Sequence, residues 1–418
     1  MTRVALVSSE PVRPRMAGIG IRYLELARRL PGCGIDVVLL SPAAPEETAE
    51  LGLAAPVRRF ERGRLRELLA DCQAAVAQGQ LANDVLLELP ELPVAIDLYD
   101  PWLVENLTYA GELGFGPFKN DHATWVLQLS RGDFFLCSSE EQRTFYLGFL
   151  AALGRVNPER LAGDPDLSTL IAPVPFGVPD ELPPHRPVLP ERAPGETRLL
   201  FGGLYDWYDP WTLLDALARL DRPGWVLHLI RNPNPESTPQ RLLAEVVARC
   251  RRDGWGERVR LLDWVPADRR YDLLRDVDLL VAPHRPSLET RLSLRTRFLD
   301  ALAAGCPVVT SGGGAMSRLL AAHDAGWVVP PGDAAALADA LVEAVEDTAA
   351  REARRACGRE LLRDFRWDRA LAPLVRFCRA PAVDASKERF VHRPGTAAPP
   401  DRLPLRIRRR LRGWGLAR

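Results

Sequence analysis

The strongest constraint on the fold is a pattern that occurs twice in the chain: an apolar run, a glycine turn and a stretch of helical periodicity. Residues 3–8 form a valine-rich run, two glycines follow, and apolar residues then recur at helical spacing. In the second half, residues 199–201 are followed by another glycine pair and a second helical stretch. A strand, a glycine turn and a helix in succession open a doubly wound parallel sheet. The sequence therefore predicts an α/β protein with two such sheets.

The predicted division of the chain follows from these two series and from its proline-rich and basic segments. The expected parts are a first Rossmann-like domain at 1–178, a linker at 179–196, a second Rossmann-like domain at 197–366, a C-terminal helix at 367–380 with a possible return to the first domain, and a basic amphipathic tail at 381–418. Two doubly wound domains in series leave a cleft between them. Ligands of such sheets bind at the carboxyl ends of the strands, so we expect the site in this cleft.

Composition narrows the class of protein. The 418 residues carry 55 basic and 55 acidic side chains, so no overall positive charge favours a nucleic-acid partner. The seven cysteines are scattered and form no CxxC pair, which indicates a reducing compartment and argues against a structural zinc site. No apolar run has the length of a transmembrane helix or of a signal-peptide core. We therefore expect a cytoplasmic protein.

The tail differs from the rest of the chain, because arginines far outnumber acidic residues in 381–418. One stripe of a predicted helix is formed by Leu403, Ile407, Leu411 and Trp414. A basic amphipathic helix over 402–416 can lie on an anionic membrane face, here the inner face of the cell membrane. The alternative is a tail that is solvated or packed on a domain, and the sequence leaves both open.

The segment from His284 to Gly314 holds the densest group of candidate site residues. Ser293, Arg297 and Asp300 share one helical face, and Ser293 is the expected N-cap. A helix N-terminus with Arg295 and Arg297 beside it favours a diphosphate, because free N–H groups and the helix dipole attract anions. Asp300, further along that face, can accept hydrogen bonds from ribose hydroxyls. The alternative interpretation is a set of ordinary surface ion pairs.

This segment resembles the donor-site signature of the GT-B glycosyltransferases, especially family 4. That signature has a glutamate, seven residues, a second glutamate, and a small-residue helix that ends in Gly-x-Pro-Val-Val. The run Asp300–Val309 matches its second half, with Asp300 in place of the second glutamate. The first glutamate would fall at Leu292, and Glu289 lies three residues earlier. The resemblance implies a ribose contact for Asp300 and a sugar contact for Glu289.

The resemblance extends over most of residues 1–380. Gly18 and Gly20 are similar to the glycine turn by which the family's backbone approaches the donor, although a Gly-x-Gly pair alone indicates only a tight turn. Gly203 lies in the turn after the first strand of the second domain, but the arginine and lysine that usually follow that turn are absent. Phosphate binding is therefore expected from Arg231, Arg295 and Arg297.

Further donor contacts are implied by position. Asn234 lies where the family has a Gly-x-Gly-Pro loop, and Trp264 and Val265 lie where the family's backbone holds the nucleobase. His284 is a candidate contact to the sugar, although a lone histidine is more often structural. An aromatic residue such as Trp264 can stack on a base, and it is as often plain packing.

In the first domain, Asp97 and Asp100 follow a predicted strand at the cleft and are the candidates to orient or deprotonate an acceptor hydroxyl. Asp100 before Pro101 is also a good start for a helix, which is the structural alternative. Asp276-Val277-Asp278 is similar to a metal-binding Asp-x-Asp motif, but it precedes a strand and is interpreted as a turn. We expect no metal ion in the site.

The function that the resemblance implies is transfer of a sugar from a nucleoside-diphosphate sugar to an acceptor hydroxyl, with retention at the anomeric carbon and with no metal or cofactor. Leu292 stands where the family has its first glutamate, and this departure bears on whether the configuration at the anomeric carbon is retained. The expected acceptor is a glycan, a lipid-linked acceptor or a small molecule, in cell-surface polysaccharide, glycolipid or natural-product synthesis. The alternatives are a sugar-nucleotide epimerase of the same fold and a non-catalytic nucleotide-sugar binding protein.

Overall fold

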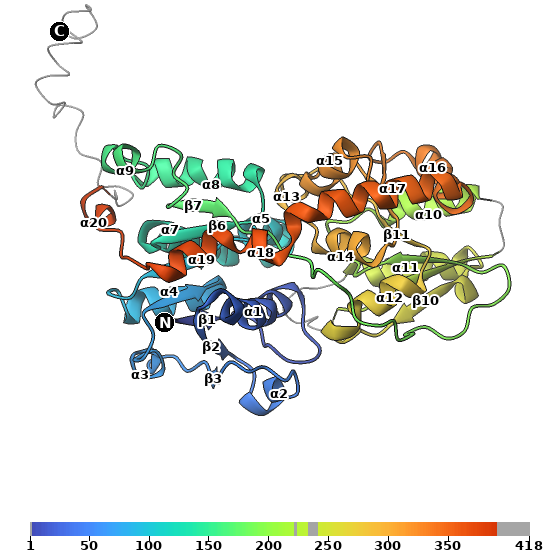
Figure 1. Ribbon diagram of the computed structural model, residues 1–418. Helices are drawn as coiled ribbons and strands as arrows, with labels where there is room; N and C mark the ends of the chain where they lie inside the picture. Colours follow the sequence, from blue (N-terminus) through green and yellow to red (C-terminus); the bar gives the residue numbers. More distant parts are fainter. Residues whose placement is uncertain (1, 221–223, 233–240, 391–418) are drawn as a thin grey trace, which may run out of the picture.

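The first domain is built on a parallel sheet. The computed structural model describes residues 2–220, 224–232 and 241–390, and within these the first sheet has seven strands in the order β3-β2-β1-β4-β5-β6-β7 (Figure 1). The strands are β1 (Arg3–Val7), β2 (Asp36–Ser41), β3 (Val57–Arg59), β4 (Ala74–Ala77), β5 (Val94–Asp97), β6 (Phe134–Cys137) and β7 (Ile171–Pro173). Most are apolar throughout and buried on both faces, as a sheet covered by helices on both sides requires.

Helices cover both faces of this sheet. Their bounds are α1 (Gly18–Arg29), α2 (Pro45–Ala49), α3 (Leu65–Leu68), α4 (Gly79–Glu88), α5 (Trp102–Asn106), α6 (Ala110–Leu113), α7 (Phe115–Arg131), α8 (Glu140–Ala152) and α9 (Pro158–Gly163). The chain runs outward from β1 to β3 and then returns to the other side of β1 at β4. The loops after β1 and β4 therefore leave the sheet in opposite directions, which opens a crevice at the carboxyl ends of these strands.

The second domain repeats this architecture with a six-stranded parallel sheet in the order β10-β9-β8-β11-β12-β13. Its strands are β8 (Thr197–Phe201), β9 (Trp225–Ile230), β10 (Val259–Leu262), β11 (Leu279–Ala282), β12 (Val308–Ser311) and β13 (Trp327–Val329). Its helices are α10 (Pro210–Arg219), α11 (Arg241–Arg252), α12 (Arg270–Asp276), α13 (Leu288–Leu292), α14 (Thr296–Ala304), α15 (Ala315–Ala322), α16 (Ala334–Glu346) and α17 (Thr348–Leu361). The crevice of this sheet lies between β8 and β11. The predicted α/β fold with two doubly wound sheets is confirmed.

The predicted linker runs along the second domain and is held by the Asp276–Asp278 turn. The carboxylate of Asp276 accepts the backbone N–H groups of Val188 and Leu189, at 2.6 and 2.8 Å. Asp278 accepts the guanidinium of Arg192 at 2.7 Å. Both aspartates of the Asp-x-Asp motif thus bind protein groups at the end of α12 and the start of β11.

After α17 the chain crosses to the first domain, where α18 (Trp367–Ala370) and α19 (Ala372–Arg379) lie against one face of the first sheet, in front of it in Figure 1. The ring of Phe377 stacks on Phe134 of β6, with centroids 5.4 Å apart. Trp367 packs on Phe176 at 5.3 Å and on the backbone of Gly177. The C-terminal segment therefore belongs to the packing of the first domain.

The start of the predicted tail is also packed on the first domain. Asp384 accepts hydrogen bonds from the buried Arg155 at 2.8 Å and lies 2.7 Å from Arg160. A short helix, α20 (Ser386–Phe390), follows. Residues 381–390 thus fit the alternative of a tail that is packed on a domain. The expected membrane contact of 402–416 lies outside the described residues.

The return of the chain to the first domain depends on the absence of a side chain at Gly177. A Cβ there would overlap the indole of Trp367, so we expect Gly177→Ala to lower the free energy of unfolding by about 1–3 kcal/mol. Urea unfolding measures it. Gly148→Ala is the matched control: this exposed glycine of α8 has open space beside it, and alanine there should add about 0.5–1 kcal/mol. Equal urea midpoints of unfolding for Gly177→Ala and the wild type would contradict the packing of Trp367 on Gly177.

Candidate functional site

Two adjoining cavities lie between the domains, at the carboxyl ends of both sheets. The cavity that we name the Asp300 cavity holds about 110 Å³ and is lined by Trp264, Val265 and Asp300, among others. The Asp100 cavity holds about 160 Å³. Its polar and charged lining residues are Glu10, Tyr99, Asp100, Glu105, Tyr205, Tyr208, Ser293, Arg295, Thr296 and Arg297. Gly18, Thr296 and Arg297 line both cavities, so these residues mark their junction.

Arg297 reaches this junction from the first turn of α14. Its guanidinium donates to the carbonyl oxygen of Gly203 at 3.1 Å, and a Cβ on Gly203 would overlap that guanidinium. Gly203 also has a φ of +65°, which favours glycine. The rings of Tyr205 and Trp264 lie 5.6 and 5.5 Å from the guanidinium carbon, within the range of cation–π attraction. The glycine turn after β8 is therefore the support on which Arg297 rests.

The prediction that Ser293 caps this helix is wrong. Helix α14 begins at Thr296 with Arg295 at the N-cap position, whereas Ser293 terminates α13. The backbone leaves the helical region at Ser293, with a ψ of 123°, so a helix cannot start there. The hydroxyl of Ser293 instead donates to Glu105 of the first domain at 3.4 Å. The start of α14 still lies at the junction, where Thr296 and Arg297 line both cavities, and the first N–H groups of a helix have no partner within it.

Arg295 and Glu289 form a buried ion pair beside the Asp100 cavity. The guanidinium donates to Oε2 of Glu289 at 2.7 Å and lies over the ring of Tyr208, 5.1 Å from its centroid. The other carboxylate oxygen of Glu289 has no hydrogen-bond partner among the described residues. Glu289 does not line either cavity. Its sugar contact stays a prediction.

Three carboxyl groups of the first domain line the Asp100 cavity. Burial raises the pKa of Asp100, although a hydrogen bond from Glu105 partly offsets it. Burial and the neighbouring Asp100 and Glu289 raise the pKa of Glu105 well above its usual range. Burial likewise raises the pKa of Glu10 to about 7, against the hydrogen bond that it accepts from the N–H of Gly20. Asp100 and Glu105 therefore form a hydrogen-bonded pair that holds a proton near neutral pH.

Asp97 lies in the interior of the first domain instead of in the cavity. The Arg22 guanidinium binds both of its oxygens, at 2.6 and 3.1 Å, and donates to the carbonyl of Val174 at 2.9 Å. Both side chains of this ion pair are almost fully buried. Asp97 lines neither cavity, so the geometry supports a structural role and not the predicted contact with an acceptor.

Most of the predicted nucleoside contacts meet in the Asp300 cavity. Asp300 lies 3.4 Å from Arg270; burial raises its pKa and that guanidinium lowers it. The indole N–H of Trp264 donates to the carbonyl of Met16, in the first domain, at 2.9 Å. Gly18 has no atom within 4 Å of where its Cβ would lie. Gly20 does not line the cavities, and a Cβ there would lie 2.9 Å from Met16.

Two further predicted contacts, Arg231 and His284, lie elsewhere. Arg231 is exposed and pairs with Asp263 at 3.3 Å, outside both cavities. His284 is buried against Tyr208, and burial lowers the pKa of its ring well below the usual range, so the ring is neutral. Its Nδ1 lies 3.2 Å from the hydroxyl of Thr310. Asn234 lies outside the described residues.

Comparison with known proteins finds a family likeness in the second domain. Residues 196–347 match the family model described as glycosyl transferases, group 1. A phosphatidyl-myo-inositol mannosyltransferase of Mycobacterium leprae is 33% identical over 139 residues, which are 33% of this chain and 36% of that protein. A D-inositol 3-phosphate glycosyltransferase of Jonesia denitrificans is 29% identical over 199 residues, 46% of this chain and 45% of that protein. The matches thus span less than half of these relatives.

Solved structures extend the likeness to both domains. Sucrose-phosphate synthase from Thermosynechococcus elongatus superposes with a TM-score of 0.68 at 17% identity, over 91% of this chain and 98% of that one. HepE of Anabaena in complex with UDP-glucose gives 0.65 at 15% identity, over 91% and 100%. At these identities the likeness concerns the fold, and the expected GT-B arrangement of two facing domains is confirmed.

Within this glycosyl transferase fold, sequence reasoning missed Glu10 and Glu105 as site residues. Glu10 lies in the loop between β1 and Gly18, and Glu105 lies in α5, directly after Asp100 and Pro101. Both follow strands that end at the crevice of the first sheet. Their position after these strands was the signal in the sequence that could have identified them, because side chains in the loops at the carboxyl ends of these strands reach the crevice.

Loss of charge should destabilise the protein at Asp97, the last residue of β5, far more than at Asp100, three residues later. Asp97→Asn leaves Arg22 buried without its counter-charge, so we expect a loss of about 3–5 kcal/mol in the free energy of unfolding. Asp100→Asn is the control, because burial already disfavours that carboxylate, and we expect no loss above about 1 kcal/mol. Urea unfolding at pH 7.5 measures both. A stable but inactive Asp97→Asn variant would restore the predicted catalytic role.

Proposed function

We propose that the protein transfers a glycosyl group from a nucleoside-diphosphate sugar to an acceptor hydroxyl. The observation that carries this proposal is the place of Arg297 and the N-terminus of α14 at the junction of the two cavities. A diphosphate there would face a guanidinium and free backbone N–H groups. The nucleoside then lies in the Asp300 cavity, with Trp264 and Val265 beside the base and Asp300 beside the ribose. The sugar extends into the Asp100 cavity.

The proposed chemistry separates charge at the anomeric carbon. The bond between that carbon and the diphosphate oxygen breaks, and its electron pair leaves with the nucleoside diphosphate. The acceptor oxygen forms the new bond, and its proton passes to the Asp100–Glu105 carboxyl pair. Arg297 and the dipole of α14 stabilise the charge that develops on the leaving group. Electrostatic stabilisation of this kind is usually the largest single contribution of a site to the rate. With this charge supplied by the protein, we propose a reaction without metal or cofactor. Retention at the anomeric carbon, implied by the resemblance, is part of the proposal.

The acceptor side of the site is acidic. The charged side chains that the first domain contributes to the Asp100 cavity are Glu10, Asp100 and Glu105, and none of the described cationic residues of that domain lines it. A phosphate on the acceptor would therefore face carboxyl groups and be repelled. We propose that the acceptor presents hydroxyl groups without a phosphate nearby, as a glycan, a lipid-linked glycan or a small polyol. Assembly of cell-surface polysaccharide or glycolipid is the proposed setting, with natural-product synthesis as the alternative.

The proposed location is the cytoplasm, at the inner face of the membrane. All seven cysteines are free, which suits a reducing compartment. Among the described residues, no helix combines the length and the apolar character needed to span a bilayer. Contact through residues 402–416 stays a prediction from their sequence.

The donor assignment predicts which nucleotides raise the melting temperature and which variant abolishes the effect. In a panel of UDP-, GDP- and dTDP-sugars, we expect one base to raise the melting temperature, because a ligand of the folded state stabilises it. Arg297→Ala should weaken that ligand at least about tenfold in calorimetric titration, through loss of a charge-assisted contact worth about 1.5–3 kcal/mol.

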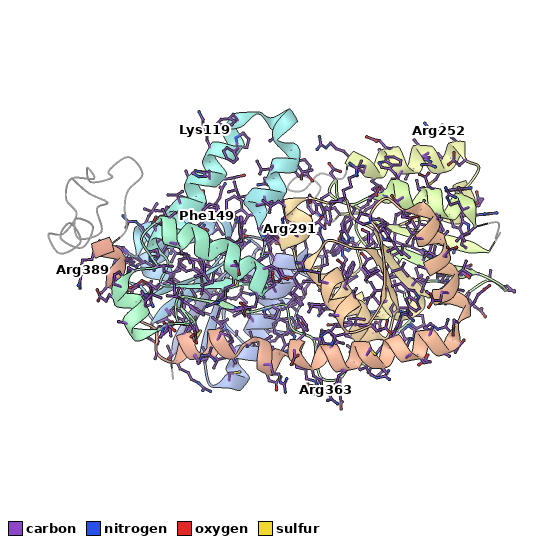
Figure 2. The ribbon with its side chains drawn as sticks, turned by 90° about the horizontal axis from the view of Figure 1, so that it is seen from above. Lys119, Phe149, Arg252, Arg291, Arg363 and Arg389 are labelled. Carbon is purple, nitrogen blue, oxygen red and sulfur yellow. The ribbon has the colours of Figure 1, made fainter. Side chains whose placement is uncertain are left out.

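Arg363→Ala is the matched control for this titration, since Arg363 lies on an outer edge of the molecule, lines neither cavity and pairs with its neighbour Glu360 at 2.7 Å (Figure 2). Unchanged affinity in Arg297→Ala would overturn the site. Conversion of the donor to an epimer without acceptor would favour the epimerase alternative.

The acidic acceptor wall predicts discrimination against phosphorylated acceptors. For matched pairs such as myo-inositol and D-inositol 3-phosphate, or mannose and mannose 6-phosphate, we expect kcat/KM at least about tenfold lower for the phosphorylated member, a difference of about 1.4 kcal/mol. The double substitution Asp100→Asn, Glu105→Gln should bring the kcat/KM values of the two acceptors closer together, and it should also lower kcat. Initial rates of nucleoside diphosphate release measure both. A phosphorylated acceptor that reacts as fast as its partner would contradict the assignment.

A further inference from the structure

The segment Leu292–Arg295 of the second domain, which joins α13 to α14, is embedded in the first domain. Figure 2 shows Arg291, at the end of α13, between the two domains. The side chain of Leu292 is 5% exposed, and the apolar cluster that encloses it otherwise consists of first-domain residues, including Leu103 of α5 and Tyr146 of α8. A carboxylate stands at this position in the family that the sequence resembles. Here a leucine anchors the segment by burial of its apolar surface.

Two first-domain side chains hold the carbonyl groups of this segment. The side-chain amide N–H₂ of Gln142 donates to the carbonyl oxygen of Leu292 at 3.1 Å and to that of Tyr99 at 2.9 Å. The hydroxyl of Tyr99 donates to the carbonyl oxygen of Leu294 at 3.0 Å. The amide oxygen of Gln142 accepts the backbone N–H of Ser138 at 2.8 Å. Both the nitrogen and the oxygen of the buried Gln142 side-chain amide thus have hydrogen-bond partners, which fixes the orientation of the amide.

Tyr99 is itself fixed from the interior of the first domain. Arg22 lies over its ring, 4.6 Å from the centroid, and Asp97 accepts its backbone N–H at 3.2 Å. The buried ion pair between Arg22 and Asp97 holds both contacts in place. A continuous series of contacts therefore runs from this ion pair through Tyr99 to the carbonyl of Leu294, next to Arg295.

We propose that Tyr99 and Gln142 are positioning residues that order the diphosphate site of the second domain when the first domain closes on it. This inference rests on the proposed function, because it assigns the diphosphate to Arg297 and the start of α14. The held segment ends at Arg295, the N-cap of α14, so its two anchored carbonyls set where that helix begins. When the domains separate, both carbonyls lose these partners, and the start of α14 loses its support.

The volumes of the two cavities fit a cycle in which the domains separate and close again. The Asp300 and Asp100 cavities hold about 110 and 160 Å³, below the roughly 300 Å³ at which ligand pockets usually begin. Because these volumes are smaller than a nucleotide sugar needs, the proposal has the donor enter when the domains lie further apart. Binding of the diphosphate then favours closure, because the diphosphate interacts best with the ordered segment, and a ligand shifts an equilibrium toward the state that it binds better.

The test compares a nucleoside monophosphate with the matching diphosphate. In Tyr99→Phe, which removes only the hydroxyl, the Kd of UDP should rise about 5- to 10-fold and that of UMP less than 2-fold, by calorimetric titration. GMP with GDP and dTMP with dTDP serve if the wild type prefers another base. The turnover number of Tyr99→Phe should fall by about the same factor as its affinity for the diphosphate. Loss of folded protein alone would leave the ratio of UDP affinity to UMP affinity unchanged.

Tyr146→Phe is the matched control. Its side chain is fully buried, and its hydroxyl also donates to a backbone carbonyl, that of Leu98 at 3.1 Å, within the first domain. We expect Tyr146→Phe to lower the melting temperature as much as Tyr99→Phe does and to leave the ratio of UDP to UMP affinity unchanged. Equal weakening of UMP and UDP in Tyr99→Phe, or the same ratio change in both variants, would overturn the proposal. A wild type that binds no nucleotide would overturn the proposed function as well.

Discussion

Arg297 can reach the junction of the two cavities because Gly202 and Gly203, directly after β8, have no side chains. Its guanidinium rests on the carbonyl of Gly203, where any Cβ would displace it. The parallel sheet places that turn at its crevice, beside the loop after β11 that leads to α14. The cation, the free N–H groups of α14 and the two cavities therefore meet at one point. The donor orientation and the chemistry proposed for the first domain both depend on that point.

The first domain contributes shape and proton transfer more than positive charge. Its carboxyl groups Glu10, Asp100 and Glu105 face a second-domain wall that carries Arg295 and Arg297. Buried carboxyl groups close to one another cannot all be ionised, so they retain protons that can be exchanged with a substrate hydroxyl. This division of charge between the domains suits the proposed anionic donor on one side and the proposed uncharged acceptor on the other.

The sequence predicted the elements of local origin and missed those that depend on distant contacts. The strand–glycine–helix pattern revealed both sheets, and Arg297 with Asp300 could be placed on one helix because their spacing is helical. Ser293 looked like an N-cap because serine favours that position, but the N-terminal start of α14 is set by contacts with the first domain. Asp97 looked catalytic because it ends a strand at the cleft. Its partner Arg22 lies 75 residues away in the chain, and no local pattern shows that ion pair. Glu105 was missed for the same reason, since its partner Ser293 belongs to the other domain.

The central claim is that a nucleoside diphosphate binds with its phosphates at the N-terminus of α14, against Arg297. A crystal structure of the protein with the nucleoside diphosphate that it prefers tests this most directly. The account predicts difference density for two phosphates within hydrogen-bond distance of the Arg297 guanidinium and the first N–H groups of α14, with the base beside Trp264. Density for the nucleotide elsewhere, or an unchanged, empty junction at saturating nucleotide, would contradict it.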